Sequence, residues 1–100
     1  MGQKPETRLV TQIIKTLREY GGFWIKIHGS PYQTAGIPDI VGCYNGRFIA
    51  LEVKRPGYEK TTNSRQELIM ERIRKAGGIS AVVTNKFEAL KRVEEANAED

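Results

Sequence analysis

The stretch that decides the fold of this chain is Ile40-Val41-Gly42-Cys43-Tyr44-Asn45-Gly46-Arg47-Phe48-Ile49-Ala50-Leu51. It consists of two apolar runs that meet at Asn45-Gly46. Asn-Gly between apolar runs is the strongest short signal for a β-hairpin, because both central residues of a type I′ turn need a positive φ. We therefore expect a two-residue turn at Asn45-Gly46, with one strand before it and one after it.

The turn also determines which residues face each other across the two strands. With a two-residue loop and no bulge, Asp39 lies opposite Glu52. Side chains alternate along a strand, so Lys54 lies on the same side of the sheet as both carboxylates. Like charges that face each other across strands are destabilising, and a divalent cation between them would convert that cost into a binding site. The register thus predicts a small acidic centre with one lysine.

Composition predicts one domain with one core. The chain has 100 residues, of which 39% are hydrophobic and 28% are charged, a size that folds as a single domain. We expect no membrane span and no signal peptide, because no apolar run is long enough. The single cysteine, Cys43, fits a reducing cytoplasm, and its place in an apolar strand predicts a buried thiol.

Charge is distributed unevenly along the chain. The net charge is +4, but residues 94–100, which we expect to form a flexible acidic tail, hold four of the 12 acids. Residues 1–93 keep all 16 Lys and Arg side chains with only 8 acids. A basic body around a small acidic centre suits a polyanionic substrate, although charge alone also fits a basic domain without such a ligand.

Hydrophobic periodicity predicts an α/β domain over residues 1–93, with a mixed central sheet and helices packed on it. The sequence Ser64-Arg65-Gln66-Glu67 is a capping box that begins the second helix, and this helix implies that the third and fourth strands pair in parallel. The expected order is α-β-β-β-α-β-α: a helix at about 6–20, a strand at 23–28, the two hairpin strands, a helix from 64 to the glycines at 77–78, a strand at 79–84, and a helix from 85.

A third acid, Glu6, belongs to the same hypothesis. Apolar residues follow it three, four, seven and eleven positions later, so Glu6 extends the core-facing stripe into the first helical turn. An acid at a helix start can simply complement the helix dipole. On the apolar stripe, however, Glu6 can instead reach the carboxylates of the sheet.

Taken together, these residues resemble the virus-type replication-repair nuclease (VRR-NUC) group of the PD-(D/E)XK nuclease superfamily. The resemblance covers about residues 6–84. It is carried by Glu6, His28-Gly29-Ser30, Gly36-Ile37-Pro38-Asp39, Gly46-Arg47-Phe48, Glu52-Val53-Lys54, Gln66 and Gly77-Gly78.

The resemblance implies an endonuclease that hydrolyses DNA with Mg²⁺ or Mn²⁺. Asp39, Glu52 and the backbone carbonyl of Val53 would hold the metal, and Glu6 would complete the site directly or through a water, with a second metal as a further alternative. The sequence has no Cys/His cluster, which favours hard cations over transition metals.

Two further residues have catalytic roles in this hypothesis. Lys54 would orient or help to deprotonate the attacking water and offset charge in the transition state. Gln66 would pack beside Lys54 or position the water, although an ordinary exposed amide is an alternative for it.

The expected partner is DNA, in particular branched DNA. Five residues flank the proposed site and are candidates for DNA contacts: Lys26, His28, Ser30, Arg55 and Lys60. The resemblance also implies Holliday-junction resolution by a homodimer or higher homo-oligomer in the cytoplasm of a bacterial or phage-infected cell. Three alternatives stay open: a nuclease for flaps or splayed arms, a non-catalytic nucleic-acid-binding module, and a structural ion cluster in which Lys54 neutralises the acids.

Overall fold

The Asn45-Gly46 hairpin forms as predicted. Strand β2 (Ile40–Tyr44) pairs antiparallel with β3 (Arg47–Val53) in the register that a two-residue turn requires. Asn45 and Gly46 have φ values of 50° and 78°, in the left-handed region that a type I′ turn needs. The register without a bulge is therefore confirmed.

The structure, a computed structural model, describes residues 4–98. The predicted mixed α/β fold and its element order are confirmed, with one short 3₁₀ helix added after the last helix. Within the described part of the chain, no helix has the length and apolarity to cross a membrane. Besides the hairpin strands, the elements are α1 (Pro5–Tyr20), β1 (Phe23–Lys26), α2 (Ser64–Lys75), β4 (Ile79–Val83), α3 (Lys86–Glu94) and η1 (Glu95–Asn97).

The four strands form one sheet in the order β1-β2-β3-β4. β1 pairs antiparallel with β2, whereas β3 and β4 are parallel, as expected for strands joined by α2. The first strand ends at Lys26, two residues earlier than expected, although the Ile27 N–H still donates to the Asp39 carbonyl at 2.8 Å. This bond holds the end of β1 against the start of β2.

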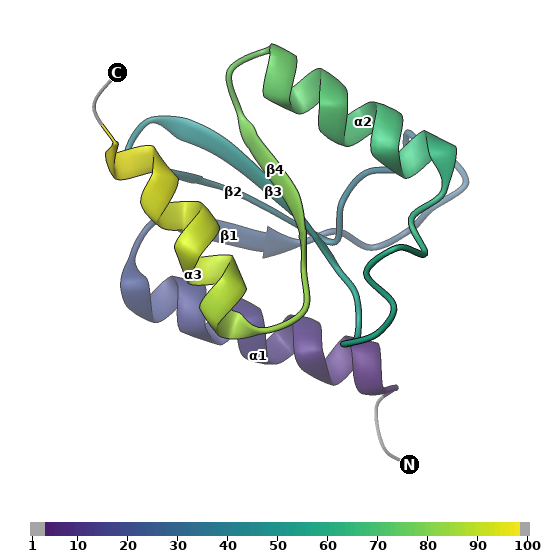
Figure 1. Ribbon diagram of the computed structural model, residues 1–100, viewed down its shortest axis with the longest axis horizontal. Coiled ribbons are helices and arrows are strands. Elements are labelled where there is room, and N and C mark those ends of the chain that lie inside the picture. Colours follow the sequence, from purple (N-terminus) through teal and green to yellow (C-terminus); the bar gives the residue numbers. More distant parts are fainter. Residues whose placement is uncertain (1–3, 99–100) are drawn as a thin grey trace.

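Helices α1 and α3 pack against each other and cover one face of the sheet (Figure 1). The apolar stripe of α1 faces inward, and Ile13 and Leu17 are completely buried. They belong to one core cluster with Trp24 and Ile49 of the sheet. Each such side chain contributes roughly 1.5–3 kcal/mol when it leaves water, so this layer holds the sheet in place.

Helix α2 covers only part of the opposite face. It packs along β4, and over β3 and β4 that face is buried at Ala50 and Ser80. Toward β1 the same face is exposed: Phe23, Cys43 and Phe48 form one cross-strand row, and their side chains reach solvent. We call Phe23, Cys43 and Phe48, with Ile25 and Val41 beside them, the open sheet face.

The open sheet face corrects one expectation. Cys43 is exposed rather than buried. The physical reason is that α2, after its crossover, lies along β4 instead of over β1 and β2. The apolar character of the hairpin strands does not reveal which part of the sheet a helix covers.

Two helix starts have side-chain caps, one of them displaced from its expected position. The N-cap of α2 is Asn63 rather than Ser64. Asn63 Oδ1 accepts the Gln66 N–H at 2.8 Å, and Gln66 Oε1 accepts the Asn63 N–H at 3.0 Å. The predicted capping box therefore exists, shifted by one residue. At α3, the Asn85 side chain accepts a backbone N–H at 2.9 Å.

The C-terminal segment differs from the expected tail. α3 continues to Glu94, and the 3₁₀ helix follows it directly. Ala96 is only 5% exposed, and its carbonyl accepts the Asn45 side-chain N–H at 2.8 Å. A small side chain and one long-range hydrogen bond thus attach this segment to the hairpin turn. Glu99 and Asp100, also assigned to the tail, lie outside the described residues.

Candidate metal centre

The predicted carboxylates lie together at one end of the sheet. Asp39 directly precedes β2 and Glu52 lies near the end of β3, so the antiparallel pairing brings them to the same end. Asp39 Oδ2 accepts the Val53 N–H at 2.8 Å. Lys54 Nζ lies 3.3 Å from Glu52 Oε2, which confirms that Lys54 shares the face of Glu52.

Gln66 joins this group from a different element. Its Nε2 lies 3.2 Å from Glu52 Oε2. Its other amide atom, Oε1, already accepts the Asn63 N–H in the capping box. Because one end of the amide is committed to the helix start, the N–H₂ end must point toward Glu52. The capping box of α2 thereby orients a side chain of the centre.

Backbone contacts hold the centre rigidly. Glu52 is 4% exposed, and the Val53 side chain next to it is fully buried. The Lys54 N–H donates to the Val83 carbonyl at 3.0 Å, which extends the β3–β4 pairing by one residue. Both sides of Glu52 are therefore fixed by the sheet, while the Lys54 side chain remains partly accessible.

The acids of the centre are poorly neutralised. Burial, followed by repulsion from Asp39, raises the pKa of Glu52 to about 7, although the charge and hydrogen bond of Lys54 oppose this. Burial also raises the pKa of Asp39, against the opposing hydrogen bond from the Val53 N–H. A neutralising salt bridge would lower the pKa of its carboxyl groups. One lysine does not balance a buried and a half-buried carboxylate when both are ionised, so the centre then lacks positive charge.

The donor atoms fit a hard divalent cation. Asp39 Oδ2 and Glu52 Oε2 are engaged by protein donors. Among the described residues, no N–H group donates to their second oxygens, Oδ1 and Oε1, while a side-chain hydrogen bond with Glu52 lowers the pKa of Asp39. Carboxylate and carbonyl oxygens are the ligands that Mg²⁺ and Mn²⁺ prefer. A divalent cation would also supply the charge that Lys54 does not.

Glu6 lies exposed in the first turn of α1. Its charge contributes to the raised pKa of Asp39 and of Glu52. Within residues 4–98, no group of three or more His, Cys, Asp and Glu side chains is arranged to hold a metal ion. The contribution of Glu6 to a metal site, directly or through a water, stays a prediction.

Of the five candidate DNA contacts, four are exposed and Lys26 is half-buried. His28 is exposed, and Ser30 Oγ accepts the Tyr32 N–H at 3.2 Å in a local turn.

The Arg55 guanidinium lies 4.4 Å from the centroid of the Tyr58 ring. Lys60 lines a groove between the loop before α2 and the helix itself, and Lys26 is partly buried at the end of β1. Among the described residues, none of the five bonds to the carboxylates.

One functional residue was missed in the sequence. Asn63 orients Gln66, and its signal was present: Asn followed three residues later by Gln is itself a capping-box pattern. The neighbouring Ser64 and Glu67 formed a second such pattern, which concealed it.

Neither a protein-family model nor a curated protein sequence matches this chain.

Proposed function

We propose that this protein is a metal-dependent endonuclease that hydrolyses phosphodiester bonds in branched DNA. One observation carries the proposal: the β2–β3 pairing holds the Asp39 and Glu52 carboxylates at one end of the sheet, and among the described residues Lys54 is the one cation that forms an ion pair there. A centre with surplus negative charge favours a divalent cation. The basic body of the chain, in turn, favours a polyanionic substrate.

In this proposal Asp39, Glu52 and the Val53 carbonyl hold Mg²⁺ or Mn²⁺, and Glu6 acts on the site from the start of α1. The bound cation supplies a water of lowered pKa and charge neutralisation at the phosphate. Lys54 orients the attacking water and offsets negative charge in the transition state.

Gln66 is a positioning residue in the same proposal. Its Nε2 holds Glu52 Oε2 at 3.2 Å, which leaves Oε1 as the oxygen available to a cation. The capping box supports this role because it prevents the amide from rotating.

Branched DNA is the preferred substrate because a domain of this size offers little surface for reading a long sequence, whereas DNA shape can be recognised with few contacts. Resolving a four-way junction takes two symmetric cuts, which require two sites related by a two-fold axis. We therefore propose a homodimer, acting in the cytoplasm of a bacterial or phage-infected cell. A monomer would favour flaps or splayed arms instead.

The contact between Lys54 and Glu52 at 3.3 Å favours a second candidate. The same residues would serve as a structural ion cluster in a non-catalytic nucleic-acid-binding protein. The two candidates differ in one consequence: only the nuclease loses turnover when the carboxylate charges are removed without loss of the fold.

The test is cleavage of duplex, single-stranded, flap and four-way DNA with Mg²⁺ by the wild type and by Asp39→Asn and Glu52→Gln. Each substitution removes ligand charge with little change in volume, so we expect a rate loss of roughly 100-fold or more, with DNA affinity in EDTA largely retained. Glu71→Gln is the control, because Glu71 is an exposed acid on α2, paired only with Lys75.

Either of two results would refute the metal assignment. One is undiminished turnover in excess EDTA, and the other is full activity in both centre variants. Absence of cleavage by the wild type, together with DNA binding, would favour the non-catalytic candidate.

A further inference from the structure

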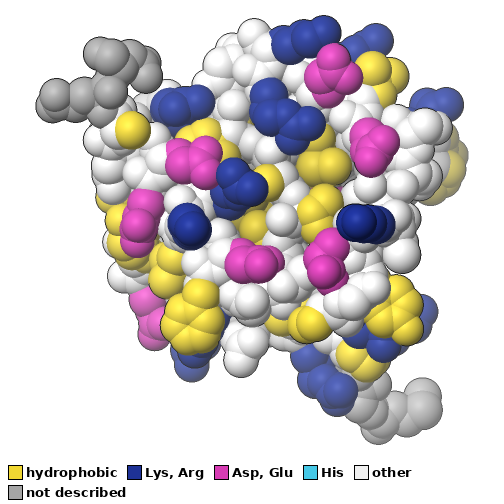
Figure 2. Space-filling view, in the orientation of Figure 1, with side chains coloured by type: hydrophobic (Ala, Val, Ile, Leu, Met, Phe, Trp, Pro, Cys, Tyr) yellow, Lys and Arg dark blue, Asp and Glu magenta, His cyan; other side chains and the backbone are white. Residues whose placement is uncertain are grey.

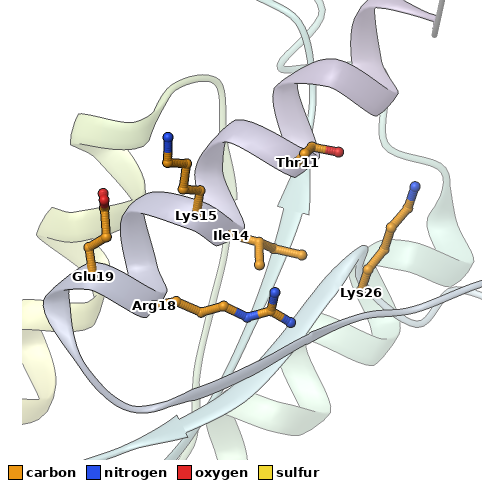
Figure 3. Close-up of a pocket in the computed structure, with 6 residues that line it drawn as sticks. All are labelled: Thr11, Ile14, Lys15, Arg18, Glu19 and Lys26. Atoms are coloured by element: carbon orange, nitrogen blue, oxygen red, sulfur yellow. The ribbon is translucent and has the colours of Figure 1, made fainter.

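A groove of about 500 Å³ lies between α1 and the edge strand β1. In Figure 3, Ile14 and Arg18 extend from α1 toward the strand, and Lys26 extends from β1 toward the helical turn that carries Thr11. Lys15 also lines the groove, but its ammonium extends from the other side of α1, away from Arg18 and Lys26. The groove thus has an apolar floor, a hydroxyl group and cationic side chains at its borders. Its lining residues are Thr11, Ile14, Lys15, Arg18, Glu19 and Lys26.

The Arg18 side chain is held in place by the sheet. Its Nη2 donates to the Trp24 carbonyl at 2.9 Å, a group that points outward from the edge strand. A guanidinium has five N–H donors, and this is the one hydrogen bond that Arg18 makes among the described residues. The remaining N–H donors belong to a side chain that is already ordered. Binding of a ligand to them therefore costs less side-chain conformational entropy.

Two lysines complete the cationic side chains at the borders of the groove. In the part of the chain that the structure describes, neither Lys15 nor Lys26 forms an ion pair. Glu19 is the one acid among the lining residues. The groove therefore carries surplus positive charge, supplied by two lysine ammonium groups and one arginine guanidinium. These are the groups that bind phosphate in proteins.

The groove begins beside the candidate metal centre. Lys26 lies opposite Ile40 across β1 and β2, and Ile40 directly follows Asp39. The hydrogen bond from the Ile27 N–H to the Asp39 carbonyl joins the two strands at this same end. Lys26 pairs with Ile40, so its side chain lies on the opposite face of the sheet from the Asp39 carboxylate. A nucleic-acid strand whose reacting phosphate lies at the centre would therefore pass around the edge strand β1 to reach the groove.

The broad face formed by α1 and α3 differs from the groove. There, acidic and basic side chains are interspersed, without a large area of one sign (Figure 2). Such a surface offers no continuous track for a polyanion. The distribution of charge thus favours the groove at the edge of the sheet, rather than the α1–α3 face, as the binding site for a polyanion.

We propose that the α1–β1 groove binds the phosphodiester backbone of a nucleic-acid strand beyond the phosphate that reacts, with Lys15, Arg18 and Lys26 as the phosphate contacts. This inference rests on the proposed function, since it takes nucleic acid as the ligand. Backbone contacts of this kind orient the strand and carry no sequence information.

The experiment is a salt titration of binding to fluorescent duplex and four-way DNA in EDTA, where no strand is cut. The double variant Lys15→Gln/Lys26→Gln is compared with Lys75→Gln/Lys91→Gln, which removes the same charge from α2 and α3. Both control lysines are exposed. Arg18 is left intact because it also supports the edge strand.

We expect the groove variant to bind about tenfold or more weakly at 0.1 M salt and the slope of log K against log salt to fall by about 2. The loss should be equal on duplex and four-way DNA, because phosphates are common to both. The control should stay within about twofold of the wild type in affinity.

Equal losses in the groove variant and the control would overturn the groove and leave the nuclease proposal intact. A loss of affinity without a change of slope would also overturn it, because it would point to altered folding rather than phosphate contacts. Failure of the wild type to bind or cut any nucleic acid would refute both proposals, so the two failures are distinguishable.

Discussion

At the scale of single residues, Glu52 is where burial and charge conflict most. It is 4% exposed, and its pKa is raised to about 7 by burial and by Asp39. In the unfolded chain the same group titrates near its ordinary value of 4.5. Below that value both states bind the proton and no penalty exists. As pH rises from 4.5 to 7, the unfolded state ionises first, so the folded state loses relative stability.

This sign leads to a prediction for stability. In EDTA, the free energy of unfolding should fall between pH 5 and pH 7.5 by up to roughly 3 kcal/mol, as measured by urea denaturation. Glu52→Gln should remove most of this fall, because the amide does not titrate. Mg²⁺ should stabilise the wild type more at pH 7.5 than at pH 5, since a cation binds the ionised carboxylates. Stability that rises over this range would contradict the raised pKa.

At the scale of elements, the start of α2 links secondary structure to the centre. The capping box orders Asn63 and Gln66 together, and Gln66 then reaches Glu52 on β3. The capping box at the start of α2 thus connects the end of the preceding loop to the buried Glu52 carboxylate through Gln66. The same helix packs along β4 and leaves the open sheet face uncovered.

The displaced cap gives a second prediction. Asn63→Ala should destabilise the fold by about 1 kcal/mol, because it leaves the Gln66 N–H without its acceptor. Ser64→Ala should change stability by a few tenths at most, since Ser64 is an exposed first helical residue. Thermal denaturation of both variants measures the difference. A larger loss in Ser64→Ala than in Asn63→Ala would restore the cap expected from the sequence.

At the scale of the whole molecule, the open sheet face is the largest departure from a closed core. Phe23 is 66% exposed and Phe48 is 48% exposed, and both flank Cys43 in one row. Side chains alternate along strands, so this row is on the same face as Asp39 and Glu52. In the proposed homodimer, this apolar face is the surface that a second copy would cover, with both centres near the shared interface.

Assembly is tested through three exposed aromatic positions, one of which is a control. Light scattering of the wild type should give at least twice the chain mass of 11.3 kDa. Phe23→Glu and Phe48→Glu should shift it to a single chain, because a buried, unpaired charge is costly at an interface. Phe87→Glu is the control, since Phe87 is 71% exposed on α3. A monomeric wild type would remove junction resolution and leave the flap or splayed-arm nuclease.

The sequence by itself determined the local part of this protein. The Asn45-Gly46 turn, the antiparallel register and the shared face of Glu52 and Lys54 were all predictable. These features follow from backbone dihedral preferences and the two-residue period of a strand, which act over a few residues. The parallel pairing of β3 and β4 was predictable for the same kind of reason, since a helix joins the two strands.

Tertiary structure alone decided the features that depend on how layers meet. These include the exposure of Cys43, the meeting of Gln66 with Glu52 and the attachment of Ala96 to the hairpin turn. Periodicity states which side of an element is apolar, but it does not state which neighbour covers that side. The position of α2 along β4 settles that question here, because it buries one half of the outer face and leaves the other half open.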